Sequence, residues 1–173
     1  MKYWALKTRE SWNRQDFTDH WNDFKTESVI AIGWEKADVS PDKASLDEIA
    51  TAIKKAYGGT DKAAITNATT IQKFVNISPG DKILVCRGYA PNQHKEVLLY
   101  GIATVTGSFE DCTSQSWRWR FRHEAEIKPF GQNGKPVPKK FLVQRLRKKA
   151  LLQTLHEITK EGFESVIEGI SKG

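Results

Sequence analysis

The stretch Trp117-Arg118-Trp119-Arg120-Phe121-Arg122 alternates aromatic rings with guanidinium groups. Successive side chains of a β-strand point to opposite faces, so we predict a strand here with two unlike faces. One face carries Trp117, Trp119, Phe121, Ala125 and Ile127. The other carries Arg118, Arg120, Arg122, Glu124 and Glu126.

Two interpretations of this strand stay open. Aromatic rings beside a row of positive charge suit single-stranded nucleic acid, or a base that has been flipped out of a duplex. A half-buried strand with Trp and Phe in a core and Arg in water has the same pattern, since charge opposite a core face is ordinary. The choice between them depends on other parts of the chain.

The positive charge of the chain is concentrated in one region. The 173 residues carry a net charge of +6, but the segment from Trp117 to Lys149 has eleven Lys or Arg and two Glu. That segment therefore carries +9 and the remaining chain −3. A regional excess of this kind is the electrostatic footprint of a protein that binds a polyanion, although a solvated basic surface would look the same.

Composition indicates a soluble globular protein with one main domain. Hydrophobic residues make up 39% and charged residues 28%, with no apolar run near the ~20 residues of a membrane span. The first residues lack the apolar region of a signal peptide. Cys86 and Cys112 have no metal-ligand spacing and are too few for a disulfide framework. We expect a cytoplasmic protein with reduced thiols and no membrane partner.

Apolar periodicity predicts a mixed α and β fold. Strands are expected at 3–7, 29–33, 82–87 and 97–105, and in the Trp-Arg stretch, with a Ser78-Pro79-Gly80-Asp81 turn before the third. Helices are expected around 17–24, from a Ser45–Glu48 capping box to Tyr57, at 62–75, from Lys139 through Leu155, and at 163–170 beyond a break at Gly162. Segment 130–136 is expected to be a loop. We predict an α+β domain built on a small, mostly antiparallel β-barrel or curved sheet.

Catalytic motifs are weak. Gly131 and Gly134 are separated by two residues where a P-loop has four, and Pro136 removes a backbone donor needed there. The four His and two Cys lack zinc-ligand spacing, so no cofactor is expected. His123 shares the aromatic parity and is expected in a core or at a pocket rim. Asp111 with Glu126-x-Lys128 matches the pattern of a metal-dependent nuclease, which stays open as an alternative.

Four segments, taken in order, resemble the PUA-like superfamily that includes EVE and YTH domains. They are Tyr3–Trp12, Ile30–Trp34 with the polar run behind it, Phe74–Val85 and Tyr100–Gly107. The combination of Ala31-Ile32-Gly33-Trp34 with Pro79-Gly80-Asp81 also resembles the N-terminal modules of McrB-type restriction systems, which bind DNA with a methylated base. The chain departs from EVE domains in lacking the Pro of their K-S-E-P stretch, and in reading Ala125-Glu126-Ile127 where they have V-x-W.

The resemblance implies a base-reading domain over residues 1–130, with a basic loop and C-terminal helical segment at 131–173 packed on it. It implies an aromatic cage for a flipped base. The base-binding candidates are Trp34 and Trp117 as cage walls, with Thr8, Arg9, Gly33 and Tyr89. The phosphate-binding candidates are Arg87, Lys95, Arg118 and Arg120, with Lys139, Lys140 and Arg145 for a more distant stretch.

We therefore expect a non-catalytic module that recognises a methylated base in DNA, as the targeting domain of a modification-dependent restriction system. Its expected partners are methylated DNA and, through that system, an AAA+ GTPase and a nuclease subunit. Three alternatives stay open: a reader of modified RNA, a metal-dependent nuclease, and a protein-interaction domain whose basic helices dock an acidic partner.

Overall fold

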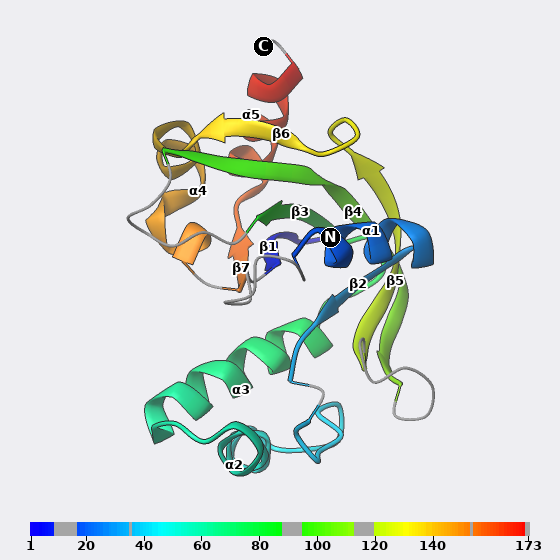
Figure 1. Cartoon of the computed structure of the whole chain (residues 1–173), viewed down its shortest axis with the longest axis vertical. Coiled ribbons are helices and arrows are strands. Elements are labelled where there is room, and N and C mark those ends of the chain that lie inside the picture. Colours follow the sequence, from blue (N-terminus) through cyan, green and yellow to red (C-terminus); the bar gives the residue numbers. More distant parts are fainter. Residues whose placement is uncertain (9–16, 35, 88–94, 113–119, 153, 172–173) are drawn as a thin grey trace.

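The computed structural model describes residues 1–8, 17–34, 36–87, 95–112, 120–152 and 154–171 (Figure 1). The strands are β1 (Tyr3–Thr8), β2 (Val29–Ile32), β3 (Lys82–Arg87), β4 (Glu96–Asp111), β5 (Phe121–Pro129), β6 (Lys135–Pro138) and β7 (Leu155–Ile158). The helices are α1 (Phe17–Glu27), α2 (Leu46–Tyr57), α3 (Asp61–Val75), α4 (Lys139–Leu152) and α5 (Lys160–Ser171). No helix among these residues is both long and apolar enough to cross a membrane.

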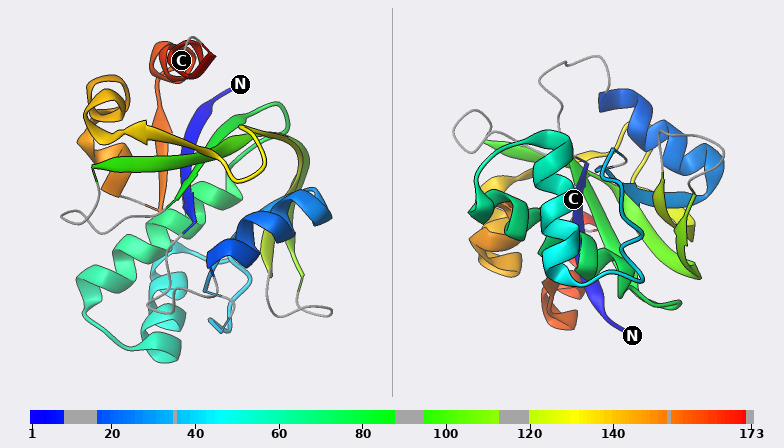
Figure 2. Two further views of the ribbon diagram at one scale, coloured as in Figure 1. Left: turned by 45° about the horizontal axis from the view of Figure 1, so that its top comes forward. Right: turned by 90° about the horizontal axis from the view of Figure 1, so that it is seen from below.

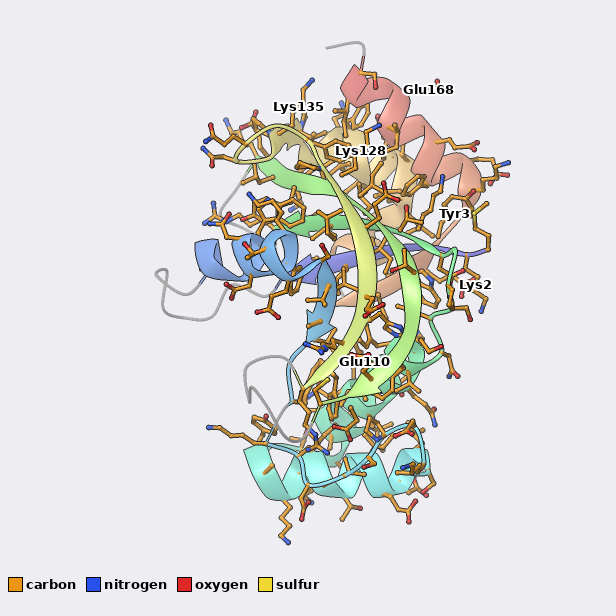
Figure 3. All side chains as sticks on the ribbon, turned by 90° about the vertical axis from the view of Figure 1, so that its right-hand side faces the viewer. Lys2, Tyr3, Glu110, Lys128, Lys135 and Glu168 are labelled. Carbon is orange, nitrogen blue, oxygen red and sulfur yellow. The ribbon has the colours of Figure 1, made fainter. Side chains whose placement is uncertain are left out.

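The strands form one strongly curved sheet in the order β2-β5-β4-β3-β1-β7, with β6 paired to β4 (Figures 1 and 2). The β1–β3 pair is parallel, and the other pairs between described strands are antiparallel. Long β4 and β5 bend together from the α4–α5 side of the molecule to the α2–α3 side (Figure 3). The expected fold class, an α+β domain on a small, mostly antiparallel curved sheet, is confirmed.

Two apolar cores occupy the two faces of the central strands. Alternate residues of β1 belong to different cores: Trp4 and Leu6 pack on one side, Tyr3 and Ala5 on the other. Ile83 and Leu84 of β3 divide in the same way. Helices α2 and α3 cover the first core, and α4 and α5 cover the second. Because β1 and β3 are buried on both faces, they read as continuous apolar runs rather than as alternating ones.

The two-faced strand predicted from the Trp-Arg stretch is confirmed where the structure describes it. Phe121, His123 and Ala125 are buried, while Glu124 and Glu126 are exposed. The ring of His123 lies within the core, with Nε2 2.8 Å from the carbonyl oxygen of Phe74. For this part of the strand the half-buried interpretation holds. Trp117, Arg118 and Trp119 lie outside the described residues.

Several local predictions are also confirmed. Ser45 caps α2: its hydroxyl accepts from the Glu48 N–H at 3.3 Å, and its own N–H donates to the Glu48 carboxylate at 2.7 Å. Hydrogen bonds from the Ser45 backbone and hydroxyl lower the pKa of Glu48. The predicted end of this helix at Tyr57 is confirmed; the Tyr57 side chain is 44% exposed, and its hydroxyl oxygen accepts from the Lys36 N–H.

The C-terminal quarter differs from the sequence prediction. Leu155, expected at the end of a long helix, lies in β7 opposite Leu6 of β1. Gly162, expected as a break, is inside α5, where a Cβ would lie 2.8 Å from the Arg145 carbonyl oxygen. Lys135–Pro138, partly assigned to a loop, pairs with β4 as β6.

Outside this quarter, strand β4 runs six residues further than expected, to Asp111. β6 and β7 are only four residues long, so their partners define them more than their own pattern does.

A buried carboxylate joins β1, β3 and the turn between α3 and β3. Asp81 accepts from the backbone N–H of Lys2 at 2.6 Å, from the Trp4 indole at 3.2 Å and from the Ser78 N–H at 3.2 Å. Its own carbonyl oxygen accepts from the Val105 N–H of β4 at 3.0 Å. The predicted 78–81 turn is confirmed by the Asp81 N–H, which donates to the Ser78 carbonyl oxygen.

We expect Asp81→Ala to lower the free energy of unfolding by about 2–4 kcal/mol, because it leaves the buried Trp4 indole N–H without its acceptor. Urea denaturation followed by tryptophan fluorescence measures this. Glu164→Ala, which removes an exposed carboxylate beside Lys160 on α5, is the control and should change it by less than about 0.5 kcal/mol. Equal effects of the two substitutions would contradict the role given to Asp81.

Candidate nucleic-acid interface

Trp34 follows directly after β2 and has an unusual backbone. Its φ is +73°, in the left-handed region, and its carbonyl oxygen accepts from the Ala37 N–H at 3.0 Å. The side chain is half-buried and packs against the edge of the first core, next to the exposed Gly33. The left-handed conformation costs a bulky L-residue roughly 1–2 kcal/mol, and such strain persists where the surroundings impose it, often at functional sites.

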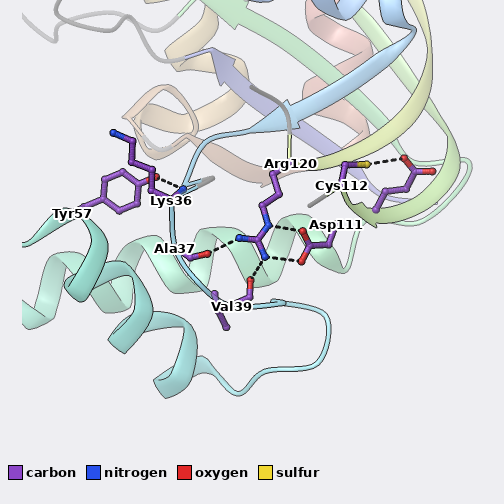
Figure 4. A network of polar contacts seen from close by, with 8 residues as sticks. Lys36, Ala37, Val39, Tyr57, Asp111, Cys112 and Arg120 are labelled. Atoms are coloured by element: carbon purple, nitrogen blue, oxygen red, sulfur yellow. Dashed lines mark hydrogen bonds and ion pairs between the residues drawn. The ribbon is translucent and has the colours of Figure 1, made fainter. Parts of the chain in front are cut away.

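Arg120 holds the chain that follows Trp34 (Figure 4). Its Nε and NH2 groups donate to the Asp111 carboxylate at 2.6 and 3.0 Å. The NH1 group donates to the Ala37 carbonyl oxygen at 2.7 Å, and NH2 also to that of Val39 at 2.8 Å. The Arg120 and Asp111 side chains are only 13% and 12% exposed. The guanidinium of Arg120 is thus committed to protein acceptors, which favours a structural role for this side chain over the predicted phosphate contact.

The fold does not bring together the residues of the predicted nuclease pattern, Asp111, Glu126 and Lys128. Asp111 lies opposite Phe121, and Glu126 lies opposite Thr104, so five residues of β5 separate the two acids. At about 3.4 Å per residue this is roughly 17 Å, too far to share one metal ion. Figure 3 shows Lys128 and Glu110, the neighbour of Asp111, toward opposite ends of the β4–β5 ribbon. Within the described ranges no group of three His, Cys, Asp or Glu could hold a metal ion.

Other predicted residues lie at the end of the sheet opposite to Trp34, where β1 and β3 end and where β4 and α4 begin. Thr8, the last residue of β1, lies opposite Arg87, the last residue of β3. The Thr8 hydroxyl is buried and donates to the Cys86 carbonyl oxygen at 3.4 Å. The Lys139 N–H at the start of α4 donates to the Lys95 carbonyl oxygen at 2.8 Å, which brings the two lysines, and with them Lys140, to the start of β4.

Arg145 is positioned by its own helix. Its guanidinium carbon lies 3.6 Å from the centre of the Phe141 ring, and NH1 donates to the Phe141 carbonyl oxygen at 3.3 Å. The Phe141 ring in turn packs against Gly169 of α5, where a Cβ would come within 2.3 Å of it. A phosphate contact by Arg145 stays a prediction, and in the structure this side chain stacks on Phe141 of its own helix, α4.

Lys7 is a residue that sequence reasoning did not select. It lies on β1 opposite Cys86 and is buried, and desolvation lowers its pKa to about 8. Burial also raises the pKa of the Cys86 thiol to about 12. Neither cysteine is in a disulfide. Perturbed lysines occur at functional sites, and Lys7 lies next to Thr8 at the end of the strand. The available signal was a lysine directly after the apolar run Tyr3–Leu6, within the same predicted strand.

Four predicted site residues lie outside the described residues: Arg9, Tyr89, Trp117 and Arg118. The pairing of Trp34 with Trp117 in a cage therefore stays a prediction. The predicted site residues that the structure does describe form two main groups. One surrounds Trp34 and the Arg120–Asp111 pair where β2, β4 and β5 meet, and the other contains Thr8, Arg87, Lys95, Lys139 and Lys140.

The curved sheet with helices on both faces defines the class of structure: an α+β fold like that of a YTH domain. No protein-family model matches the chain, and no curated protein has a significantly similar sequence. The solved structures do provide matches, and they establish the likeness in fold.

The protein Rpa0253 from Rhodopseudomonas palustris matches with a TM-score of 0.54 at 14% identity, over 99% of this chain and 94% of that chain. The YTH domain of Zygosaccharomyces rouxii MRB1, solved with N6-methyladenosine RNA, matches with a TM-score of 0.53 at 10% identity, over 98% and 86%. Human THYN1, solved with DNA that contains 5-methylcytosine, matches more loosely, with a TM-score of 0.43 at 12% identity, over 100% and 99%.

The backbone of Trp34 can be tested with two truncations. Both Trp34→Gly and Trp34→Ala remove the ring, but only Ala retains a Cβ that clashes at positive φ. We expect the Gly variant to be more stable than the Ala variant by about 1 kcal/mol in urea denaturation, because glycine adopts this conformation without strain. At an ordinary helix or strand position the order is reversed, so an Ala variant that is the more stable would contradict the left-handed conformation.

Burial of Lys7 predicts a pH-dependent stability. Between pH 8 and 10.5 the folded chain releases the Lys7 proton while the unfolded chain keeps it, so the Lys7 contribution to stability rises with pH. Lys7→Met removes the cost of burying the charge. We expect it to stabilise the protein most at pH 7 and progressively less toward pH 10, measured by urea denaturation. Lys55→Met, on an exposed part of α2, controls for the loss of one charge. A difference that does not change with pH would contradict a buried Lys7 amine.

Proposed function

We propose that this protein is a non-catalytic reader that binds nucleic acid carrying a modified base, with Trp34 as one wall of the site for the flipped base. The observation that carries this proposal is the half-buried Trp34 held in a left-handed conformation at the end of β2, beside the Arg120–Asp111 pair. The likeness in fold to a YTH domain solved with N6-methyladenosine RNA supports it.

The energies indicate how such a site works. Stacking of a base on an aromatic ring contributes about 1–3 kcal/mol. Burying an added methyl group contributes about 0.8 kcal/mol, which is only a several-fold preference. Hydrogen bonds to the base edge must supply the rest of the selectivity. Of the predicted base-edge residues that the structure describes, the backbone near Gly33 lies next to Trp34, and we assign these hydrogen bonds to it first. Thr8, Arg9 and Tyr89 stay candidates from the resemblance, and Thr8 lies in the other group, opposite Arg87. The Thr8 hydroxyl donates to Cys86, and its oxygen retains acceptor capacity for this role.

Phosphates of the flanking strand are assigned to the basic group at the ends of β1 and β3 and the starts of β4 and α4. These residues are Arg87, Lys95, Lys139 and Lys140. Contacts of this kind set position and affinity and carry no sequence information, so affinity should fall steeply with salt. Arg118 and Arg145 are secondary candidates, and Arg120 is no longer one.

We place DNA first as the nucleic acid. The sequence resemblance of Ala31–Trp34 and the 79–81 turn to modules of McrB-type restriction systems supports it, and in such a system an AAA+ GTPase and a nuclease subunit would be the cytoplasmic partners. RNA is the second candidate, and the observation in its favour is the fold shared with the YTH domain that was solved with RNA.

The decisive experiment is a binding series on matched DNA and RNA oligonucleotides, unmodified or with methyladenine or methylcytosine. We expect the protein to prefer one modified DNA by several-fold or more, and Trp34→Ala to remove that preference by loss of stacking. Ile65→Ala, which removes an exposed apolar side chain on α3, is the matched control and should leave the preference unchanged. Fluorescence anisotropy at several salt concentrations measures affinity and salt slope together.

Each outcome of the series is informative. A preference for modified RNA over modified DNA would select the second candidate. Equal binding of all oligonucleotides would reduce the protein to an electrostatic binder and contradict base reading. Cleavage of plasmid that depends on Mg²⁺ would contradict the non-catalytic assignment.

A further inference from the structure

Arg120 connects two segments that are far apart in the sequence. Its acceptors on Ala37 and Val39 lie 83 and 81 residues away, in the stretch that follows Trp34. Its other acceptor, Asp111, is the last residue of β4. Through one guanidinium, the chain after β2 is therefore tied to the ends of β4 and β5 (Figure 4).

The Arg120 backbone closes the same end of the sheet. Its carbonyl oxygen accepts from the Cys112 N–H at 2.8 Å, one step beyond the Asp111–Phe121 pair of β4 and β5. Residues 113–119, which include the proposed cage wall Trp117, lie between Cys112 and Arg120 in the sequence. Arg120 thus directly follows the segment that contains Trp117. Its side chain donates to carbonyl groups of the chain that follows Trp34.

Arginine is the side chain that this arrangement requires. The planar guanidinium offers donors in fixed directions, and four hydrogen bonds to two carbonyl groups and one carboxylate use them. A lysine ammonium has the same charge but cannot span these acceptors in one plane. Asp111 offsets the charge, so the group has little net attraction for a phosphate.

We infer that Arg120 is a positioning residue whose guanidinium, paired with Asp111, sets the position of Trp34 relative to the β4–β5 end from which the segment with Trp117 departs. The consequence for ligand binding rests on the proposed function, whereas the mechanical link between the segments does not. Two independent measurements therefore test it.

The neighbouring arginine on β5 provides a matched control. Arg122 Nε donates to Glu110 at 2.9 Å, and its NH1 lies 4.0 Å from Glu27. Its side chain is 33% exposed, and its partners among the described residues are acidic side chains rather than the carbonyl groups of Ala37 and Val39. Arg122→Lys thus repeats the chemical change of Arg120→Lys on the same strand without affecting the link.

The first measurement needs no ligand. Amide exchange by NMR should show the Ala37 and Val39 N–H groups, bonded to Trp34 and Ala37 carbonyl oxygens, exchanging about tenfold faster in Arg120→Lys and in Asp111→Asn. Arg122→Lys should leave both rates unchanged. Unchanged rates in Arg120→Lys, with the variant folded by its circular dichroism, would overturn the inference whatever the protein binds.

The second measurement uses the preferred modified oligonucleotide and its unmodified match. We expect Arg120→Lys and Asp111→Asn each to lower the modified-to-unmodified preference toward unity and to leave the salt slope unchanged. If Arg120 were instead a phosphate ligand, Asp111→Asn would strengthen binding by releasing it, and Arg120→Ala would lower the salt slope by about 0.9. The sign of the Asp111→Asn effect separates these roles.

The two failures are distinguishable. A wild-type protein with no preference for any modified base, but with faster exchange at Ala37 and Val39 in Arg120→Lys, would refute the proposed function and leave the link intact. A wild-type preference that both Arg120→Lys and Asp111→Asn retain in full would refute the positioning role and leave the proposed function intact.

Discussion

The buried carboxylate of Asp81 is the contact on which the arrangement of the sheet depends. It accepts three N–H groups, from Lys2, Trp4 and Ser78, at the point where parallel β1 and β3 begin. Parallel strands cannot be joined by a tight hairpin, so a tertiary contact must set their register. Because β1 also pairs with β7, and β3 with β4, the position of these two strands places most of the sheet.

A second, partly buried charge, Arg120, has a comparable role at the other end of the fold. A guanidinium with a carboxylate partner and two carbonyl acceptors is stable in a partly buried site, whereas either partner alone would be an uncompensated charge. The two charges organise different regions. Asp81 sets the strands of the scaffold, while Arg120 holds the strained Trp34 segment against that scaffold. Rigid support of this kind is what the base-binding role proposed for Trp34 requires.

Structural features that depend on residues close together in the sequence were predictable. The capping box of Ser45 and Glu48, the 78–81 turn and the parity of Phe121, His123 and Ala125 depend on neighbouring residues and were read correctly. β6 and β7 were missed because each has four residues and is a strand through its pairing with β4 or β1. Arg120 was assigned to phosphate because alternation shows only which face a side chain occupies. Trp34 was selected from a resemblance, and its left-handed backbone had no sequence signal.

The sequence by itself determined the fold class, the two-faced β5 and the regional positive charge, because periodicity, capping and charge are properties of short segments. Only the tertiary structure decided that Arg120 contacts Asp111 and the 37–39 carbonyl groups, that Lys7 is buried, and that Asp111 and Glu126 are too far apart for a metal site. The physical reason is that desolvation and hydrogen bonding depend on what surrounds a side chain in space. The carbonyl acceptors of Arg120 come from a segment about eighty residues away, which no local pattern specifies.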